Sequence, residues 1–393
     1  MPWVLVALGV RQGLELDRAV TAHSILAPSS AARRVQCPGS VRLEAANPET
    51  EDSPASADGT AVHFAASEML AGREPEISTA APNGVFLTRE MLEAADVYVE
   101  YIRRVLTPFG MVPEDGAIEV SLNIPQVHAL SHGTPDYRAW LPTTPRRTLF
   151  VADLKYGHGV VEAFENWQLM EYASGATSHW LLDDLTTDVL LAVVQPRAFH
   201  REGPVREWRL PASDLRGYIN RSRAAAVEAL GPDPTFRTGE ECLHCRGRHA
   251  CTTLQRVGFR GMDEAGKRQP FDLPPAAMGL EIRMLGDAIK RLTARHSGLE
   301  EQALAQIKRG IQIPGLAIEQ GVGRKQWKLP DAQVLSLGAM MGVDLAKPAA
   351  PITPTQAEAK GFPLDAMPEL IETPRTGATL VIDDGARARR VFG

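Results

Sequence analysis

The chain has 393 residues, of which 44% are hydrophobic and 23% are charged, and its formal net charge is −6 at pH 7. This length allows a substantial core and about two domains, and the net negative charge excludes a polycation that binds nucleic acid along its whole length. The apolar run at residues 1–10 is too short to span a membrane and has no basic start. We therefore expect a cytoplasmic protein in which residues 1–22 are a leader of uncertain structure.

The N-terminal part predicts helices. Residues 23–40 are expected to form a helix that ends at Cys37-Pro38-Gly39, and the polar stretch 47–58 is expected to be a mobile loop. Thr60 is placed as the cap of the next helix, and His63 lies off the centre of its apolar stripe. Residues 89–107 predict a further amphipathic helix.

Beyond residue 116 the pattern changes to short β-rich runs, and we expect an α/β core whose last strand runs parallel to a neighbour. A long helix is expected at about 276–308, in a C-terminal accessory region that spans 256–393. The expected strands are 117–124, 133–141, 148–156, 188–195 and an extension at 206–210, with helices at 163–183 and 213–230.

Two acids and a lysine lie on two of these strands. Asp136 and Asp153 are expected on adjacent strands, where both carboxylates can converge on one ion, and Lys155 lies on the same face as Asp153. Carboxylates suit Mg²⁺ or Mn²⁺, which neutralise phosphate oxygens and make water more acidic. Such charges are costly to bury in an apolar strand without a role, although a structural ion pair remains an alternative. The pattern indicates metal-assisted cleavage of a phosphodiester.

Taken with its surroundings, this set resembles the PD-(D/E)XK nuclease superfamily in its RecB-like branch. Gly133-Thr134-Pro135-Asp136 is similar to the strand with the first acid, and Asp153-Leu154-Lys155 to the D-x-K core. Each residue alone also fits an ordinary structural role, but their order along the chain favours the joint interpretation. The remaining matches are Gln168-x3-Tyr172 on the following helix, the upstream helical His63, and Glu119 on the first strand.

This resemblance covers about residues 23–255 and implies a restriction-endonuclease-like core, with a mixed central sheet flanked by helices. It implies that His63, Asp136, Asp153 and the backbone carbonyl of Leu154 bind Mg²⁺ or Mn²⁺. It also implies that Gln168 and Tyr172 position DNA or the active-site strand.

The cysteines form one pattern, with Cys37 upstream of these motifs and Cys242-x2-Cys245-x5-Cys251 downstream. The spacing alone fits structural Zn²⁺, for which His244 or His249 could substitute as a ligand, or an iron–sulfur cluster, or four free thiols. The arrangement is similar to the iron–sulfur RecB-like exonucleases of the AddAB and CRISPR-associated types, which implies a structural 4Fe-4S cluster.

Two further segments predict contacts with nucleic acid. Residues 197–260, beginning at Arg197, contain twelve Arg and no Lys against seven Asp plus Glu, which suits a phosphate backbone or, alternatively, a solvated surface. Arg324, Lys325 and Trp327 combine charge with a stacking ring, unless the Trp is simply buried. The layout also resembles a phage and prophage family of unknown function.

The function expected from these observations is a metal-dependent DNA exonuclease used in phage recombination, replication or repair, with single strands or DNA ends as its substrate. Phage or host recombination and replication proteins are possible partners. The alternatives are a catalytically weak accessory protein that binds DNA, and an endonuclease or ribonuclease with the same site.

Overall fold

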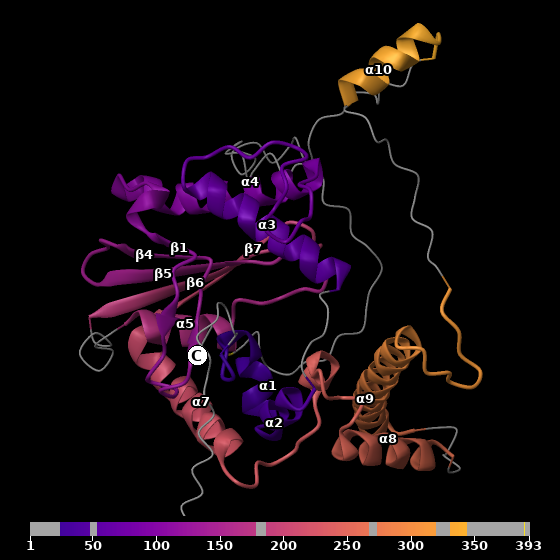
Figure 1. Ribbon diagram of the computed structural model, residues 1–393. Coiled ribbons are helices and arrows are strands. Elements are labelled where there is room, and N and C mark those ends of the chain that lie inside the picture. The colour runs from indigo at the N-terminus through magenta and orange to yellow at the C-terminus, as the bar shows by residue number, and fades with distance from the viewer. Residues whose placement is uncertain are drawn as a thin grey trace, which may run out of the picture.

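The computed structural model describes residues 24–47, 53–177, 186–266, 273–319, 331–343 and residue 389. Within these residues, a five-stranded mixed sheet in the order β1-β4-β5-β6-β7 forms the centre of the fold (Figure 1). Its strands are β1 (Ala117–Ile118), β4 (Tyr137–Leu141), β5 (Arg147–Leu154), β6 (Thr187–Val194) and β7 (Val205–Pro211).

The two central strands, β5 and β6, run parallel, and the other neighbouring pairs in this sheet are antiparallel. This arrangement confirms the predicted parallel return and the extension by β7. The run at 117–124 is not a single strand, however. It divides into β1 and β2 (Leu122–Asn123), and β2 pairs with β3 (His132–Gly133) in a separate small sheet.

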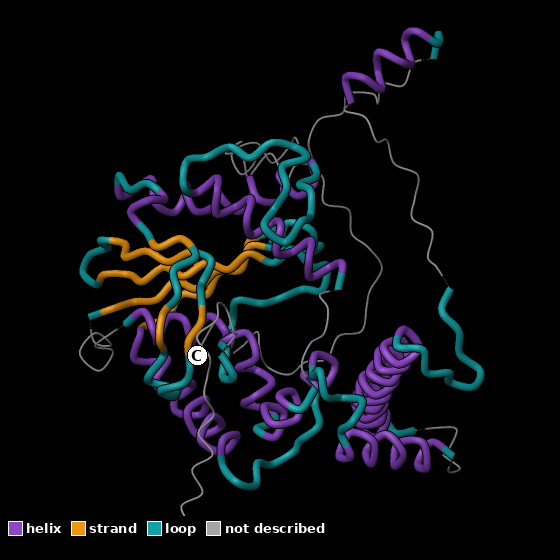
Figure 2. The backbone as a smooth tube through the Cα atoms, viewed as in Figure 1, coloured by secondary structure: helices purple, strands orange, loops and turns teal. Residues whose placement is uncertain are grey.

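Helices cover both faces of the sheet (Figure 2). Helices α3 (Pro54–Leu70) and α4 (Arg89–Leu106) pack on one face, against the side chains of Phe150 and Ala152. Helices α5 (Trp167–Ala176) and α7 (Leu215–Leu230) pack on the other, against Leu149 and Val151. Because neighbouring residues of a strand face opposite sides, β5 contributes to both cores, and its near-continuous apolar run is explained by burial on both faces.

The N-terminal helix differs from the prediction. A short turn, η1 (Pro28–Ser30), leads into α1 (Ala31–Gln36). This helix ends before Cys37, and a second helix, α2, spans Gly39–Ala45. Cys37 adopts φ −139° and ψ 87°, since a residue that precedes proline is disfavoured in the helical region. The predicted end of the helix at Cys37-Pro38-Gly39 is therefore confirmed, whereas its predicted start near residue 23 is wrong, because the helix begins at Ala31.

The start of α3 also differs. The helix begins at Pro54 and is capped by Ser53, whose side chain accepts a hydrogen bond from the amide of Ser56 at 3.1 Å. The prediction of Thr60 as the cap is wrong, and residues 54–58 are helical rather than part of a loop. Serine followed by proline at the first helical position is itself a strong start signal, and it outweighs the polar composition.

The C-terminal part is helical, with η5 (Glu240–His244), α8 (Thr252–Ala265), α9 (Pro275–Lys308) and α10 (Asp331–Met340). The long helix α9 confirms the prediction for 276–308. Gly298 of α9 packs closely against the loop that contains Arg248, since a Cβ atom added at this glycine would lie 2.5 Å from Arg248 Cγ. In the described part of the chain, we find no helix with the length and apolar character that a membrane crossing requires.

Candidate functional site

The sheet places Asp153 at the end of a central strand and Lys155 directly after it. Asp153 is 2% exposed, and its Oδ2 atom lies 2.6 Å from Lys155 Nζ. Burial would lower the pKa of Lys155, but the carboxylates of Asp153 and Asp136 raise it above its ordinary value. The lysine is therefore an ammonium ion that can offset negative charge but cannot accept a proton.

Gln168 joins this pair to helix α5. Its side-chain amide donates to Asp153 Oδ1 at 3.0 Å, and its carbonyl oxygen accepts from Lys155 Nζ at 3.2 Å. The same amide lies 3.4 Å from the hydroxyl of Tyr172, one helical turn further on. Asn166 caps α5 by accepting from the amide of Leu169, which fixes the direction from which Gln168 approaches. Gln168 thus holds both charged side chains in place.

Asp136 lies just before β4 and contacts two other elements. Its Oδ2 accepts a hydrogen bond from the backbone amide of Leu154 at 2.6 Å, and its Oδ1 is 3.2 Å from His63 Nδ1 on α3. Burial would raise the pKa of Asp136, but His63 and Lys155 hold it below its ordinary value. Burial, with the charge of Asp136, raises the pKa of Asp153. The main chain of Leu154 is therefore at the site through its amide, while its side chain is fully buried in the core on the α3 and α4 side.

Glu119 reaches the site through an unusual backbone conformation. Its φ of 49° lies in the left-handed region, where a non-glycine residue is uncommon. Its amide donates to the carbonyl of Asp136 at 3.1 Å, and its Oε1 lies 3.8 Å from His63 Nδ1. The local cost of such a conformation is typical of functional sites, and here it turns the carboxylate towards His63.

Three of these side chains form a group that suits a cation. Among the described residues, His63, Glu119 and Asp136 each offer a ligand atom within 4.8 Å of the other two. Burial would lower the pKa of His63, but Asp136, Glu119 and Asp153 raise it to about 10. In addition, Asp153 Oδ2 is buried and accepts no hydrogen bond, although Lys155 lies beside it. Three carboxylates that share the positive charges of Lys155 and of a protonated His63 form the kind of site that a divalent cation would fit.

The structure brings together every residue predicted for the acidic site, namely His63, Glu119, Asp136, Asp153, Leu154, Lys155, Gln168 and Tyr172. The compact group that suits a cation contains Glu119, however, while Asp153 is directed to Lys155 and Gln168. Sequence reasoning missed Tyr98 of α4, which is buried and donates to the carbonyl of Ala152 at 3.2 Å. An aromatic residue on an apolar helix face carries no signal that could have identified it.

Gly133 of the Gly-Thr-Pro-Asp motif has a packing role. A Cβ atom there would lie 2.8 Å from Pro28 Cδ and 3.0 Å from the ring of Tyr172. The glycine allows the N-terminal segment and the α5 tyrosine to close over the strand that leads to Asp136.

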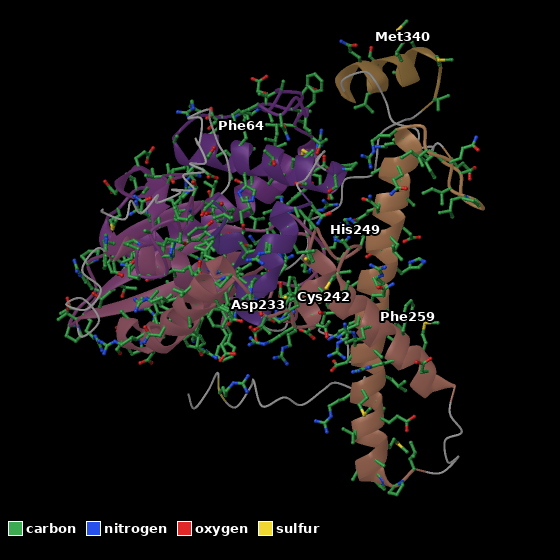
Figure 3. The ribbon with its side chains drawn as sticks, turned by 60° about the horizontal axis from the view of Figure 1, so that its bottom comes forward. Phe64, Asp233, Cys242, His249, Phe259 and Met340 are labelled. Atoms are coloured by element: carbon green, nitrogen blue, oxygen red, sulfur yellow. The ribbon has the colours of Figure 1, made fainter. Side chains whose placement is uncertain are left out.

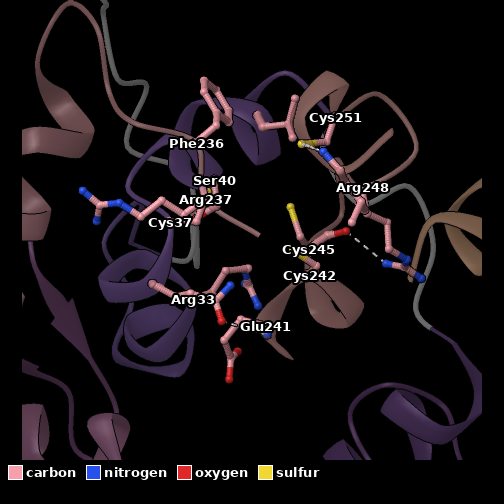
Figure 4. Close-up of a pocket in the computed structure, with 13 residues that line it drawn as sticks. Arg33, Cys37, Ser40, Phe236, Arg237, Glu241, Cys242, Cys245, Arg248 and Cys251 are labelled. Atoms are coloured by element: carbon pink, nitrogen blue, oxygen red, sulfur yellow. Dashed lines mark hydrogen bonds between the residues drawn. The ribbon is translucent and has the colours of Figure 1, made fainter. Parts of the chain in front are cut away.

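The four cysteines line one pocket, to which α1, the residues around η5 and the start of α8 contribute (Figure 4). All four are free thiols, and Cys37, Cys242 and Cys245 are less than 10% exposed. Figure 3 shows that Cys242 and His249 lie beside the long helix α9, where Arg295 donates to the carbonyl of His249. The predicted grouping of Cys37 with the C-x2-C-x5-C run is thus present in the fold.

Each sulfur in this pocket faces a main-chain amide. The amides of Arg237, Gly239 and Leu254 donate to Cys37, Cys242 and Cys251, each at 3.4 Å, and the amide of Gly247 bonds to Cys245. Such bonds favour thiolates over thiols. Burial acts in the opposite direction, and it raises the pKa of Cys37 and Cys242 and takes that of Cys245 to about 12.

The spacing of the sulfurs bears on which group fits them. A tetrahedral zinc site with bonds of about 2.3 Å separates its sulfurs by about 3.8 Å. Within the described residues, no three of the cysteine sulfurs lie within 4.8 Å of one another, since the group that meets this distance is the one around His63. The donor set of this pocket is four free thiols, which suits either structural Zn²⁺ or an iron–sulfur cluster.

Of the residues predicted to contact nucleic acid, Arg197 lies beyond the end of β6, with its guanidinium 4.3 Å from the centre of the Tyr156 ring. Its Nε atom is 3.0 Å from Glu90. Arg324, Lys325 and Trp327 lie outside the described residues, as do residues 1–22.

The mixed α/β architecture and these two clusters define a fold with two candidate metal centres. The chain belongs to the family described as "Protein of unknown function (DUF2800)", whose model matches residues 23–388. The match includes both clusters and extends through the C-terminal helices.

Proposed function

We propose that this protein is a metal-dependent phosphodiesterase of the PD-(D/E)XK, RecB-like type that cleaves DNA. The observation that carries the proposal is the convergence of His63, Glu119 and Asp136 within 4.8 Å of one another, beside the linked side chains of Asp153 and Lys155. The mixed sheet with helices on both faces is compatible with this class. The exonuclease mode, and a role in phage DNA recombination, replication or repair, rest on the resemblance alone.

The site residues have different roles in this proposal, and their charge determines which. His63, Glu119, Asp136 and Asp153 would hold Mg²⁺ or Mn²⁺. When bound, such a cation neutralises phosphate oxygens and makes water more acidic. Lys155, kept protonated by two carboxylates, offsets the charge that develops on the phosphate. Gln168 keeps the ammonium and the Asp153 carboxylate at fixed positions.

The test is degradation of end-labelled single- and double-stranded DNA in Mg²⁺, in Mn²⁺ and in EDTA. We expect the wild type to cleave only with a divalent cation, and Asp136→Asn and Lys155→Met to lose about 100-fold or more in rate. Matched controls are Asp233→Asn and Lys290→Met, which change exposed residues distant in sequence from the motifs. Binding without cleavage by all proteins would leave an accessory DNA-binding protein instead.

The cysteine pocket is proposed to hold a 4Fe-4S cluster rather than structural Zn²⁺. The preference for a cluster over zinc rests on the resemblance of the cysteine pattern, and the amide directed to each sulfur suits thiolate ligands of either group. Anaerobically purified protein should contain iron and acid-labile sulfide in equal amounts, and Cys245→Ser should lose both. Stoichiometric zinc without sulfide would contradict the cluster.

A further inference from the structure

The loop between β6 and β7 carries the most exposed large hydrophobic side chain in the described part of the chain. Phe199 is 95% exposed, and the next most exposed such residue, Met340, is at 80%. Exposing a phenylalanine forgoes the stabilisation that burial would bring, so its position on an ordered loop at the edge of the sheet needs an explanation.

Gln195, at the start of this loop, is 1% exposed and holds the loop in place. Its side-chain amide donates to the carbonyls of Gly157 and Gly159 at 2.8 and 2.7 Å, and its Oε1 accepts from the amide of Val161 at 3.0 Å. Buried Arg206 donates to the same Oε1 at 2.5 Å. Gln195 therefore joins its own loop to the loop that follows Lys155.

Two further contacts hold the residues on either side of Phe199. The carbonyl of Arg197 lies 3.2 Å from His158 Nδ1, and His200 Nε2 lies 3.4 Å from Glu162. The neighbours of the ring are thus held against the 157–162 loop while the ring itself projects into solvent. A rigid base beneath an exposed aromatic ring reduces the entropy lost when that ring binds a partner.

The position of this loop relates it to the acidic site. Asp153 of β5 pairs with Val193 of β6, and Leu154 pairs with Val194, so the two strands end at the same edge of the sheet. The amide of Lys155 donates to the carbonyl of Val194 at 2.9 Å. Tyr156, next to Lys155, lies under the guanidinium of Arg197, two residues before Phe199. The exposed ring thus belongs to a loop that begins beside the candidate catalytic lysine.

We propose that Phe199 is a stacking platform for an unpaired base of a DNA single strand whose backbone passes the acidic site. The proposal rests on the proposed function and specifies its substrate. Arg201, two residues after Phe199, adds an exposed positive charge to the same loop, since its side chain is 59% exposed and its contact with Glu202, at 3.6 Å, is a weak surface pair. A single ring is too small for a stable protein interface but matches the area of one base, and stacking of this kind is independent of base identity.

The test measures binding without cleavage, in EDTA, by fluorescence anisotropy of labelled oligonucleotides with the full chain. We expect Phe199→Ala to bind a single strand about 5- to 100-fold more weakly than the wild type, and Phe199→Trp to retain the affinity. Binding of a blunt, fully paired duplex should not change. The matched control is Phe86→Ala, which removes another exposed phenylalanine, 64% exposed, from a different loop.

A strand of abasic sugar-phosphates separates stacking from a structural effect of the substitution. The wild type should lose affinity for this strand to the level of Phe199→Ala, and the variant should bind abasic and ordinary strands equally. Equal single-strand affinity for Phe199→Ala and the wild type, or equal losses on duplex and single strand, would overturn the proposal. The proposed function is judged separately by cleavage in Mn²⁺, so either proposal can fail while the other holds.

Discussion

The acidic cluster around Asp136 and the cysteine pocket around Cys242 differ in how much of their structure the polypeptide holds by itself. The acids lie between two extensive apolar cores, and hydrogen bonds join Asp136, Asp153, Lys155 and Gln168 to each other or to the main chain. The buried cluster at the cysteines consists of Cys242, Leu254 and Ala294. We therefore expect the acidic cluster to keep its geometry without an ion and the cysteine pocket to depend on the metal group proposed for it.

The largest effect should follow from removing a cysteine. With the proposed cluster bound, Cys245→Ser should lower the free energy of unfolding by more than about 5 kcal/mol, because binding of a structural metal is coupled to folding and contributes about 10–16 kcal/mol for Zn²⁺ in zinc-finger peptides. Urea unfolding and limited proteolysis would measure this loss, with cleavage expected near η5. Asp153→Asn is the comparison from the acidic cluster and should leave stability nearly unchanged. Equal losses in the two variants would remove the distinction between the sites.

The second largest effect is expected from breaking the buried ion pair that joins the helix before Cys37 to α5, which carries Gln168. Arg34, three residues before Cys37, forms a fully buried ion pair with Glu171 of α5, and both contact Ser222 of α7. Arg34→Met should cost about 3–5 kcal/mol because it leaves the carboxylate unpaired, while Arg34→Met combined with Glu171→Met should recover most of the loss.

The surface pair of Arg73 and Glu68 provides the control for this measurement. Arg73→Met should leave the free energy of unfolding nearly unchanged, because this ion pair is exposed to solvent. If the double replacement at Arg34 and Glu171 were as unstable as the single one, the penalty would come from packing rather than from an unpaired charge.

A smaller effect concerns pH. The pKa of His63 is raised from 6.5 to about 10 by the surrounding carboxylates. Its stabilising contribution is therefore complete below about pH 6.5 and is lost as the pH rises through about 10. In EDTA, the melting temperature of the wild type should fall by several degrees over this range more than that of His63→Gln. Because a cation must displace this proton, the affinity for Mn²⁺ should rise with pH; an affinity independent of pH would exclude His63 as a ligand.

The smallest change in stability is expected for Glu119→Gly. Glycine removes the cost of the positive φ at this position but is more flexible in the unfolded chain, so the net change should stay within about 1 kcal/mol. Binding of Mn²⁺, measured calorimetrically, should nevertheless weaken about 10-fold or more. Glu165→Gly is matched in backbone, with φ 54°, but its carboxylate contacts Tyr218, and its substitution should leave Mn²⁺ binding unchanged.

The sequence predicted the parts of the fold that depend on local pattern. The apolar runs of β5 and β6, their parallel pairing and the length of α9 agree with the structure, as does the convergence of the acidic residues. The order of the motifs was sufficient for Asp136, Asp153 and Gln168, because they lie at neighbouring strand ends and on the helix that follows. His63, on the earlier helix α3, was assigned through the resemblance.

Other features depended on contacts between residues far apart in sequence. The sequence marked the end of the first helix at Cys37-Pro38-Gly39 but not the second helix that begins at Gly39, whose amide donates to the carbonyl of Thr235. The inclusion of Glu119 in the cation group requires a backbone conformation that no residue pattern encodes. The bridging role of Gln195 requires two loops that only the folded sheet brings together.

The pocket that joins Cys37 to residues beyond 236 also sets an order of events during synthesis. The amide of Arg237, which bonds to the Cys37 sulfur, belongs to a residue 200 positions later in the chain. At the usual speed of translation, this length takes roughly 10 to 40 s to emerge from the ribosome. Throughout that interval, the Cys37 thiol lacks its contact with Arg237, and the cluster that we propose for this pocket could be inserted only after Cys251 has emerged.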